Sequence, residues 1–116
     1  KNEVSIVSNG KFYRNYLHVT DAARMIIHLL KQKKFSKSIY LACSRDNILF
    51  LDAVKLLAEM YEKKFNKKIK INQNFHSNYI TDTRSFKLTP SQIFLESFKY
   101  KYDMKKGFAE LLKGEI

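Results

Sequence analysis

Arg14 is the side chain whose type and surroundings most strongly suggest ligand binding. It stands in the aromatic run "KFYRNY", directly before a helix pattern, in a chain with only four arginines against eighteen lysines. A guanidinium held at a strand end presents a planar fork of N–H donors, which suits phosphate or carboxylate oxygens. The alternative interpretation is structural, with Arg14 lying on the ring of Tyr13 or Tyr16 in a cation–π contact.

Other combinations of residues that carry chemistry are missing from the sequence. The only glycines are Gly10, Gly107 and Gly114, so there is no Gly-rich phosphate loop. The three histidines do not stand at metal-ligand spacing, and a single cysteine excludes an internal disulfide or a cysteine-built zinc site. No serine stands in a nucleophile elbow. We therefore predict no catalytic residue, no cofactor site and no metal site within this chain.

The net charge of +11 comes almost wholly from lysine. The lysines lie in scattered groups such as "KQKK" and "NKKIK", whereas base readout favours the flat arginine fork. A solvated lysine-rich surface explains this composition, and we expect no nucleic-acid partner. No apolar run approaches the roughly eighteen residues of a membrane helix, and no signal-peptide pattern opens the chain. We therefore expect a soluble, cytoplasmic protein without membrane contact.

The pattern of apolar residues predicts one α/β domain over 1–116. A hydrophobic content of 45% supports a modest core. From the N-terminus the patterns predict a hairpin around Asn9-Gly10, a helix over 19–34, a buried strand over 37–44, a helix over 50–65, a strand over 68–72, an irregular loop over 73–83 and a final helix begun by Asp103.

The first predicted helix shows apolar residues at helical spacing and a choice of caps. Thr20 or Asp21 is suited to accept hydrogen bonds from its first amides, and lysines collect at its C-terminal end. The residues expected to form its apolar face are Ala22, Ala23, Ile26, Ile27 and Leu30.

The stretch "FYRNYLHVTDAARMI", residues 12–26, resembles a segment of the extended short-chain dehydrogenase/reductases, the NAD-dependent epimerase/dehydratase family that acts on nucleotide sugars. The family segment reads Arg-Asp-(Phe/Tyr)-(Ile/Val/Leu)-(His/Tyr)-Val-x-Asp-x-(Ala)-x-Ala. The stretches 39–61, 80–90 and 104–114 resemble later elements of the same family, in the same order. The residues that match the first segment in register are Arg14, Tyr16, Leu17, His18, Val19, Asp21 and Ala23.

The resemblance implies an α/β fold made of the C-terminal, substrate-binding portion of such an enzyme, with small mixed sheet elements and three or four helices. The family arginine at the position of Arg14 binds the diphosphate of the nucleotide sugar. The NAD or NADP site and the catalytic Tyr-x-x-x-Lys pair, in which lysine lowers the pKa of the tyrosine, belong to the N-terminal Rossmann half, which lies outside this chain. The resemblance therefore implies that these 116 residues alone are inactive, and it leaves room for a homodimer of the intact enzyme.

Several positions depart from the family pattern. Asn15 replaces the aspartate that follows the arginine and offers only a neutral hydrogen bond. The second phosphate-binding arginine has no basic counterpart near Asn72, so His76 or Arg84 is expected to take its place. The predicted substrate-binding set is therefore Arg14, Asn15, His76 and Arg84. Further departures stand at Cys43 and Arg45, where glycines are usual, and at Ser85, where lysine or arginine is usual.

Two further functions stay open from the sequence. In the first, the chain is a free-standing basic module that binds nucleotides without catalysis. In the second, it is an interaction module that contacts nucleic acid through its lysines. The resemblance instead predicts the nucleotide-sugar-binding portion of an epimerase, dehydratase or reductase, with the strand over 37–44 adding to a sheet supplied elsewhere.

Overall fold

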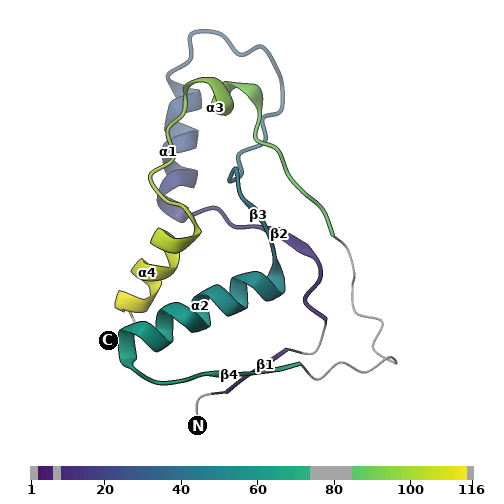
Figure 1. Ribbon diagram of the computed structural model, residues 1–116. Coiled ribbons are helices and arrows are strands. Elements are labelled where there is room, and N and C mark those ends of the chain that lie inside the picture. Colours follow the sequence, from purple (N-terminus) through teal and green to yellow (C-terminus); the bar gives the residue numbers. More distant parts are fainter. Residues whose placement is uncertain (1–2, 7–8, 74–84, 115–116) are drawn as a thin grey trace.

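The computed structural model describes residues 3–6, 9–73 and 85–114 as a mixed α/β fold (Figure 1). Four helices and four short strands occur in the described residues. In chain order they are β1 (Glu3–Ile6), β2 (Tyr13–Asn15), α1 (Val19–Leu30), β3 (Asn47–Leu49), α2 (Phe50–Phe65), β4 (Lys70–Gln73), α3 (Gln92–Ser97) and α4 (Met104–Gly114).

The strands form two separate two-stranded sheets. β1 pairs with β4 in parallel, with Glu3 opposite Lys70, whereas β2 pairs with β3 in antiparallel fashion, with Arg14 opposite Ile48. The predicted hairpin between β1 and β2 is therefore wrong, since each strand pairs with a segment more than thirty residues away in the sequence.

Gly10 lies directly against the start of α2. Its φ of 68° lies in the left-handed region, which glycine adopts without strain, and Leu51 at the start of α2 packs directly on it. The Leu51 amide donates to the Gly10 carbonyl at 3.0 Å, and a Cβ at position 10 would lie 2.6 Å from the Leu51 Cβ. The turn therefore carries the chain closely past a helix start.

The helix predictions from local pattern are largely confirmed, although α1 ends at Leu30 and not at residue 34 as predicted. α2 occupies the predicted range 50–65, and α4 begins directly after Asp103, whose carboxylate accepts from the Lys106 amide at 2.8 Å. The strand predicted over 68–72 is found as β4, which begins two residues later and ends one residue later. Helix α3 was not predicted, because six residues are too few for a clear apolar period.

The predicted strand over 37–44 is not found. Only Cys43 of this segment is buried, and Ile39 is 83% exposed. Leu41 exchanges hydrogen bonds with Ser91 at the start of α3, through its amide to the Ser91 hydroxyl and its carbonyl from the Ser91 amide. Within the described residues no strand pairs with this segment, which therefore stays extended without a ladder.

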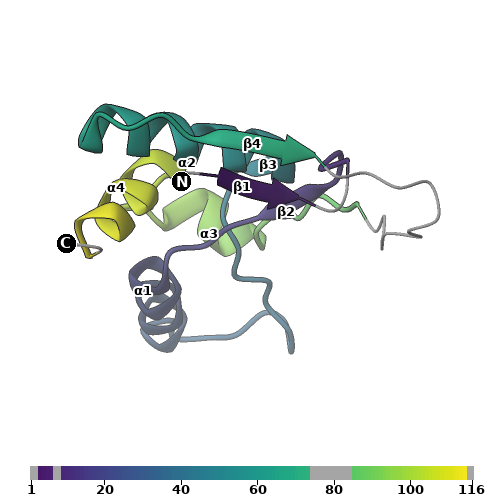
Figure 2. The same cartoon turned by 90° about the horizontal axis from the view of Figure 1, so that it is seen from below.

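The main core is small and joins α1 to α3. Met25 and Phe94 have no exposed surface, and Phe98 packs on both. The molecule is flat and open, with a Cα radius of gyration of 17.3 Å, whereas a compact domain of this length has about 13 Å. Figure 2 shows α1 on the opposite side of the molecule from α2 and β4.

Candidate functional site

Arg14 lies in β2 with its guanidinium between two aromatic rings. The guanidinium carbon lies 4.3 Å from the centroid of the Phe12 ring and 5.7 Å from that of Phe86, and Nη1 donates to the Tyr13 carbonyl at 3.0 Å. Phe12 in turn stacks on Phe50 of α2, with centroids 5.2 Å apart. These contacts hold the half-buried guanidinium in a defined orientation at one end of α2.

The cation–π contact predicted for Arg14 is present, but with other rings than Tyr13 or Tyr16. The cation over Tyr13 is Lys87, at 4.3 Å from the ring centroid. The charge of Arg14 instead affects the pKa of Tyr16. Partial burial raises the pKa of Tyr16, and the charge of Arg14 offsets part of that rise. The positive charge of Arg14 thus reaches beyond its own strand.

Asn15 uses its side-chain amide to connect β2 to the segment before β3. Its Oδ1 accepts from the Ser44 amide at 2.9 Å, and its Nδ2 donates to the Ser44 carbonyl at 2.8 Å. A longer contact, 3.3 Å, joins Nδ2 to Oδ1 of Asn47. The structure therefore gives Asn15 a bridging role within the fold, and its predicted contact with substrate stays a prediction.

The other two predicted substrate-binding residues, His76 and Arg84, lie outside the described residues, as does nearly all of the predicted loop over 73–83. The chain that follows them returns to β2. The Tyr13 amide donates to the Ser85 hydroxyl at 3.0 Å, and the Phe86 ring, 48% exposed, lies near Arg14. Residues distant in sequence therefore meet at Arg14.

Asp21 and His18 have structural roles at the start of α1. The N-cap is His18, whose Nδ1 accepts from the Thr20 amide at 3.0 Å, so the predicted caps Thr20 and Asp21 are corrected. Asp21 is fully buried and accepts from the backbone amides of Lys101 and Tyr102 at 3.0 and 2.9 Å. The side chain of Asp21 therefore points into the molecule and does not cap the first amides of α1.

The pKa of Asp21 reflects these contacts. Burial by itself raises the pKa, but the two backbone hydrogen bonds and the hydrogen bond from Arg24, 2.7 Å long, outweigh burial and hold the pKa below its ordinary value. Asp21 is therefore a charged anchor that fastens the chain before α4 to α1.

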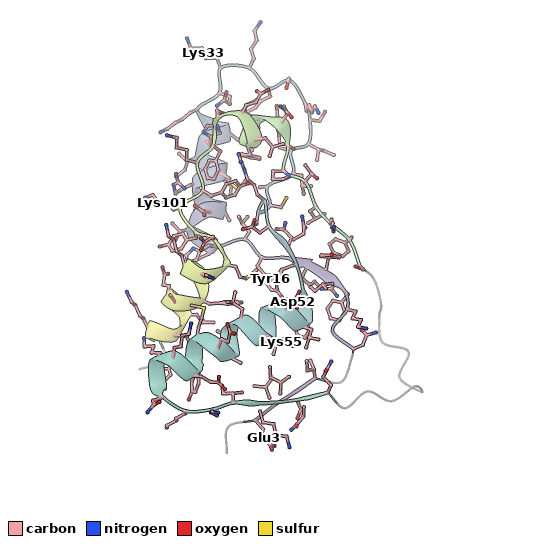
Figure 3. The ribbon with its side chains drawn as sticks, viewed as in Figure 1. Glu3, Tyr16, Lys33, Asp52, Lys55 and Lys101 are labelled. Carbon is pink, nitrogen blue, oxygen red and sulfur yellow. The ribbon has the colours of Figure 1, made fainter. Side chains whose placement is uncertain are left out.

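A cavity of about 490 Å³ opens beside this anchor, between α4 and the end of β2. Figure 3 shows Tyr16 in this part of the molecule. The rings of His18 and Tyr102 stack face to face in its wall, with centroids 3.6 Å apart. His18 Nε2 donates to Glu110 at 3.2 Å, because Nδ1 is already an acceptor, and the hydrogen bond from Tyr102 is the main cause that lowers the pKa of Glu110.

Tyr102 and Lys106 stand at the Tyr-x-x-x-Lys spacing, which the sequence analysis did not single out. The hydrogen bond to Glu110, followed by burial, raises the pKa of Tyr102, which is the opposite of what an acid–base tyrosine needs. The spacing is therefore not accompanied by the lowered tyrosine pKa of an acid–base pair.

The described residues form neither a glycine-rich dinucleotide loop nor a cluster of metal-ligating side chains. The three glycines lie far apart in sequence and do not make a dinucleotide loop, and no group of three or more metal-ligating side chains is formed in the described part of the chain. None of the described helices is long and apolar enough to cross a membrane.

Comparison with known proteins identifies the fold. No protein-family model and no curated protein matches the sequence. Among solved structures, that of RMD from Pseudomonas aeruginosa complexed with NADPH matches 97% of this chain, with a TM-score of 0.72 and 17% identity. That of TunA, an NAD-dependent NDP-hexosamine 5,6-dehydratase involved in tunicamycin biosynthesis, also matches 97%, with a TM-score of 0.61 and 15% identity.

The chain therefore shares its α/β fold with a portion of each of these two structures, which agrees with the fold that the resemblance to the C-terminal portion of the extended short-chain dehydrogenase/reductases implies. The predicted fold class is thereby confirmed. The chain spans 35% of the length of each of the two proteins that it matches.

The two phenylalanine rings beside Arg14 were not predicted from the sequence. Phe12 is two residues from the arginine, so its side chain lies on the same face of an extended strand, and this spacing was a usable signal. Phe86 gave no comparable signal, because it is 72 residues away along the chain.

Proposed function

We propose that this chain is the nucleotide-sugar-binding portion of an NAD- or NADP-dependent epimerase, dehydratase or reductase of the cytoplasm. The observation that carries the proposal is the guanidinium of Arg14, held by Phe12 and Phe86 at the end of β2, within a fold matched over 97% of the chain by structures of two pyridine-nucleotide enzymes. Arg14 then contacts the diphosphate of the substrate through charge-assisted hydrogen bonds.

The cofactor belongs in this proposal to a further part of the enzyme. The chain has no dinucleotide-binding glycine loop, and the pKa of Tyr102, the tyrosine at the Tyr-x-x-x-Lys spacing, is raised rather than lowered. In this proposal its residues therefore bind and orient the nucleotide and do no redox chemistry. His76 and Arg84 remain proposed second contacts to the phosphates, and Asn15 a neutral one.

Binding of nucleoside diphosphates tests the proposal. UDP and GDP are titrated into the isotopically labelled chain, and amide chemical shifts are followed by NMR. We expect weak binding, with a Kd of about 1 mM, because one arginine without the rest of the cleft offers few contacts. Arg14→Ala should weaken it by about tenfold or more, since a charge-assisted hydrogen bond is lost.

Arg45→Ala is the matched control for the titration. Arg45 also donates to a backbone carbonyl, that of Leu95 at 3.1 Å, and also lies over a ring, that of Tyr100 at 5.7 Å. The substitution Arg45→Ala removes the same charge from a similar setting and should leave the Kd for the nucleoside diphosphate unchanged. Equal losses for both variants would contradict a specific role of Arg14. Tight nucleic-acid binding that weakens steeply with salt and ignores Arg14→Ala would favour the interaction-module function instead.

A further inference from the structure

A basic pocket of about 420 Å³ lies between the second half of α1 and the end of α3. Figure 1 shows α3 beside the C-terminal end of α1. Neither Arg14 nor the rings of Phe12 and Phe86 are among its described lining residues, so the pocket is separate from the proposed diphosphate contact. We call it the α1–α3 pocket, and its polar lining residues are Arg24, His28, Lys31, Ser97 and Lys99.

Arg24 is held in a fixed orientation in this pocket by two contacts. Its Nη1 donates to the buried carboxylate of Asp21 at 2.7 Å, and its guanidinium carbon lies 4.8 Å from the centroid of the Phe98 ring. The side chain is still 30% exposed, and a guanidinium carries five N–H donors, of which the bond to Asp21 uses one. Arg24 therefore offers further donors to an anion with little loss of side-chain entropy on binding.

His28 and Ser97 join the two helices in the wall of the pocket. The Ser97 hydroxyl donates to the Ile93 carbonyl at 2.9 Å, so its oxygen accepts from His28 Nε2 at 2.8 Å. The His28 ring also packs edge-on against Phe98, with centroids 5.6 Å apart. These contacts fix α3 against α1, so the two helices hold the lining side chains of the pocket at a defined spacing.

The charges on the pocket predict an anionic ligand. Arg24, Lys31 and Lys99 carry three positive charges, and the negative charge of Asp21 lies buried against Arg24. No carboxylate lines the pocket among the described residues. Since the C-terminal end of α1 adds only about half a negative charge, an excess of about 1.5 positive charges remains. This excess matches a phosphate monoester, whose charge is about −1.5 to −2 at neutral pH.

A second pocket provides a comparison in which only lysines supply the charge. It lies between α2 and α4, has the same volume of about 420 Å³, and is lined by the exposed Lys63, Lys64 and Lys113. Neither arginine nor histidine lines it among the described residues. The α2–α4 pocket is therefore a control for charge and volume without an oriented guanidinium.

We propose that the α1–α3 pocket is a binding site for a phosphate monoester. Arg24 donates from its planar fork to the phosphate oxygens, and the exposed Lys31 and Lys99 add positive charge. The lining also includes Phe98 and the exposed Ile27. These apolar side chains suit the organic group that a monoester has and inorganic phosphate lacks. The proposal goes beyond the proposed function and does not depend on nucleotide binding at Arg14.

Titration of the 116-residue chain with phosphates tests the proposal. Phenyl phosphate and inorganic phosphate are added separately at constant ionic strength, and amide chemical shifts are followed by NMR. We expect saturable shifts at residues 24–31 and 97–101, with a Kd of about 1 mM for phenyl phosphate. Phenyl phosphate should bind at least about threefold more tightly than inorganic phosphate, because its ring buries apolar surface. The amides of 60–64 and 109–113, at the α2–α4 pocket, should stay unshifted.

Paired substitutions identify the cations that bind. Lys31→Gln combined with Lys99→Gln should weaken the binding of phenyl phosphate by about tenfold or more. Lys63→Gln combined with Lys113→Gln is the matched control, removes the same charge from the α2–α4 pocket and should leave the Kd unchanged. Arg24→Lys keeps the positive charge but loses the planar fork, and should also weaken binding by about tenfold.

Equal losses for the two lysine pairs, or shifts of similar size at both pockets, would overturn the proposal in favour of a general basic surface. Inorganic phosphate that binds as tightly as phenyl phosphate would overturn the assignment to a monoester. Arg14→Ala should leave the Kd for phenyl phosphate unchanged, whereas we expect it to weaken the binding of UDP and GDP. Failure of this proposal and failure of the proposed function are therefore recognised separately.

Discussion

The two faces of α1 differ in what the chain itself supplies against them. The inner face is covered by α3 and by the chain before α4, where Met25 packs on Phe94 and Asp21 binds the backbone of 101 and 102. On the outer face Val19, Ile26 and Leu30 are 77%, 58% and 72% exposed, so the described residues leave these apolar side chains largely uncovered. The difference shows that an apolar helix face in a sequence predicts burial against another surface, but does not indicate whether that surface belongs to the same chain.

Removal of the central core ring should have the largest effect on this comparison. Phe94→Ala deletes a ring with no exposed surface that meets Met25 and Phe98. We expect a loss of about 3–5 kcal/mol in the free energy of unfolding, measured by urea denaturation. Phe35→Ala, which removes a 60% exposed ring, is the matched control and should cost far less. Equal losses would mean that the α1–α3 core is not the stabilising one.

The buried carboxylate of the inner face comes next. Asp21→Asn replaces one acceptor oxygen by a donor. Because the Lys101 amide and Arg24 donate to one oxygen and the Tyr102 amide to the other, at least one of these three bonds is lost, and the variant should be destabilised by about 2 kcal/mol at pH 7. Asp103→Asn is the control, because asparagine caps α4 as well as aspartate does. A loss at Asp103 as large as at Asp21 would contradict the anchoring role.

The same residue predicts a pH dependence. Since the pKa of Asp21 is lower in the folded chain than its unfolded value of about 3.9, its contribution is fully present above that value and is lost as pH falls through the folded-state pKa. The stability difference between the natural chain and Asp21→Asn should therefore shrink on acidification below about pH 4. A difference that grows instead would reverse the inferred shift.

Substitution of two glycines should change the stability of the chain by smaller amounts. Gly107→Ala in α4 should stabilise by about 0.5–1 kcal/mol, since a Cβ there meets only His18 Cδ2 at an ordinary 3.8 Å. Gly10→Ala should destabilise, because of its φ of 68° and the contact with Leu51. Thermal unfolding of the two variants gives both signs, and stabilisation by Gly10→Ala would contradict the close packing on α2.

Substitution on the outer face should have the smallest effect. Leu30→Gln should change the stability of the 116-residue chain by no more than about 0.5 kcal/mol, because the side chain is largely solvated. Its neighbour Leu29 packs against the core, so Leu29→Gln is the matched variant and should cost clearly more. Similar losses in the free energy of unfolding for the two variants, measured by urea denaturation, would show that the outer face of α1 is already covered in this chain.

The candidate site was only partly predictable. The unusual position of Arg14 singled it out from the sequence, because arginine is rare here and the strand and helix patterns around it are local. Its ring partner Phe86 and the return of Ser85 to β2 could not be predicted, since they join residues 72 positions apart. His18 as a cap was missed because histidine is seldom a cap, whereas Thr20 and Asp21 are residues of the preferred types.

By itself the sequence determined the bounds of α2 and the start of α4, because apolar period and capping depend on residues within a few positions of one another. Only the tertiary structure decided the strand partners, the buried face of α1 and the fate of the segment over 37–44. Strand pairing and helix burial depend on contacts between residues that are distant in the sequence, and the local pattern of residues does not specify those contacts.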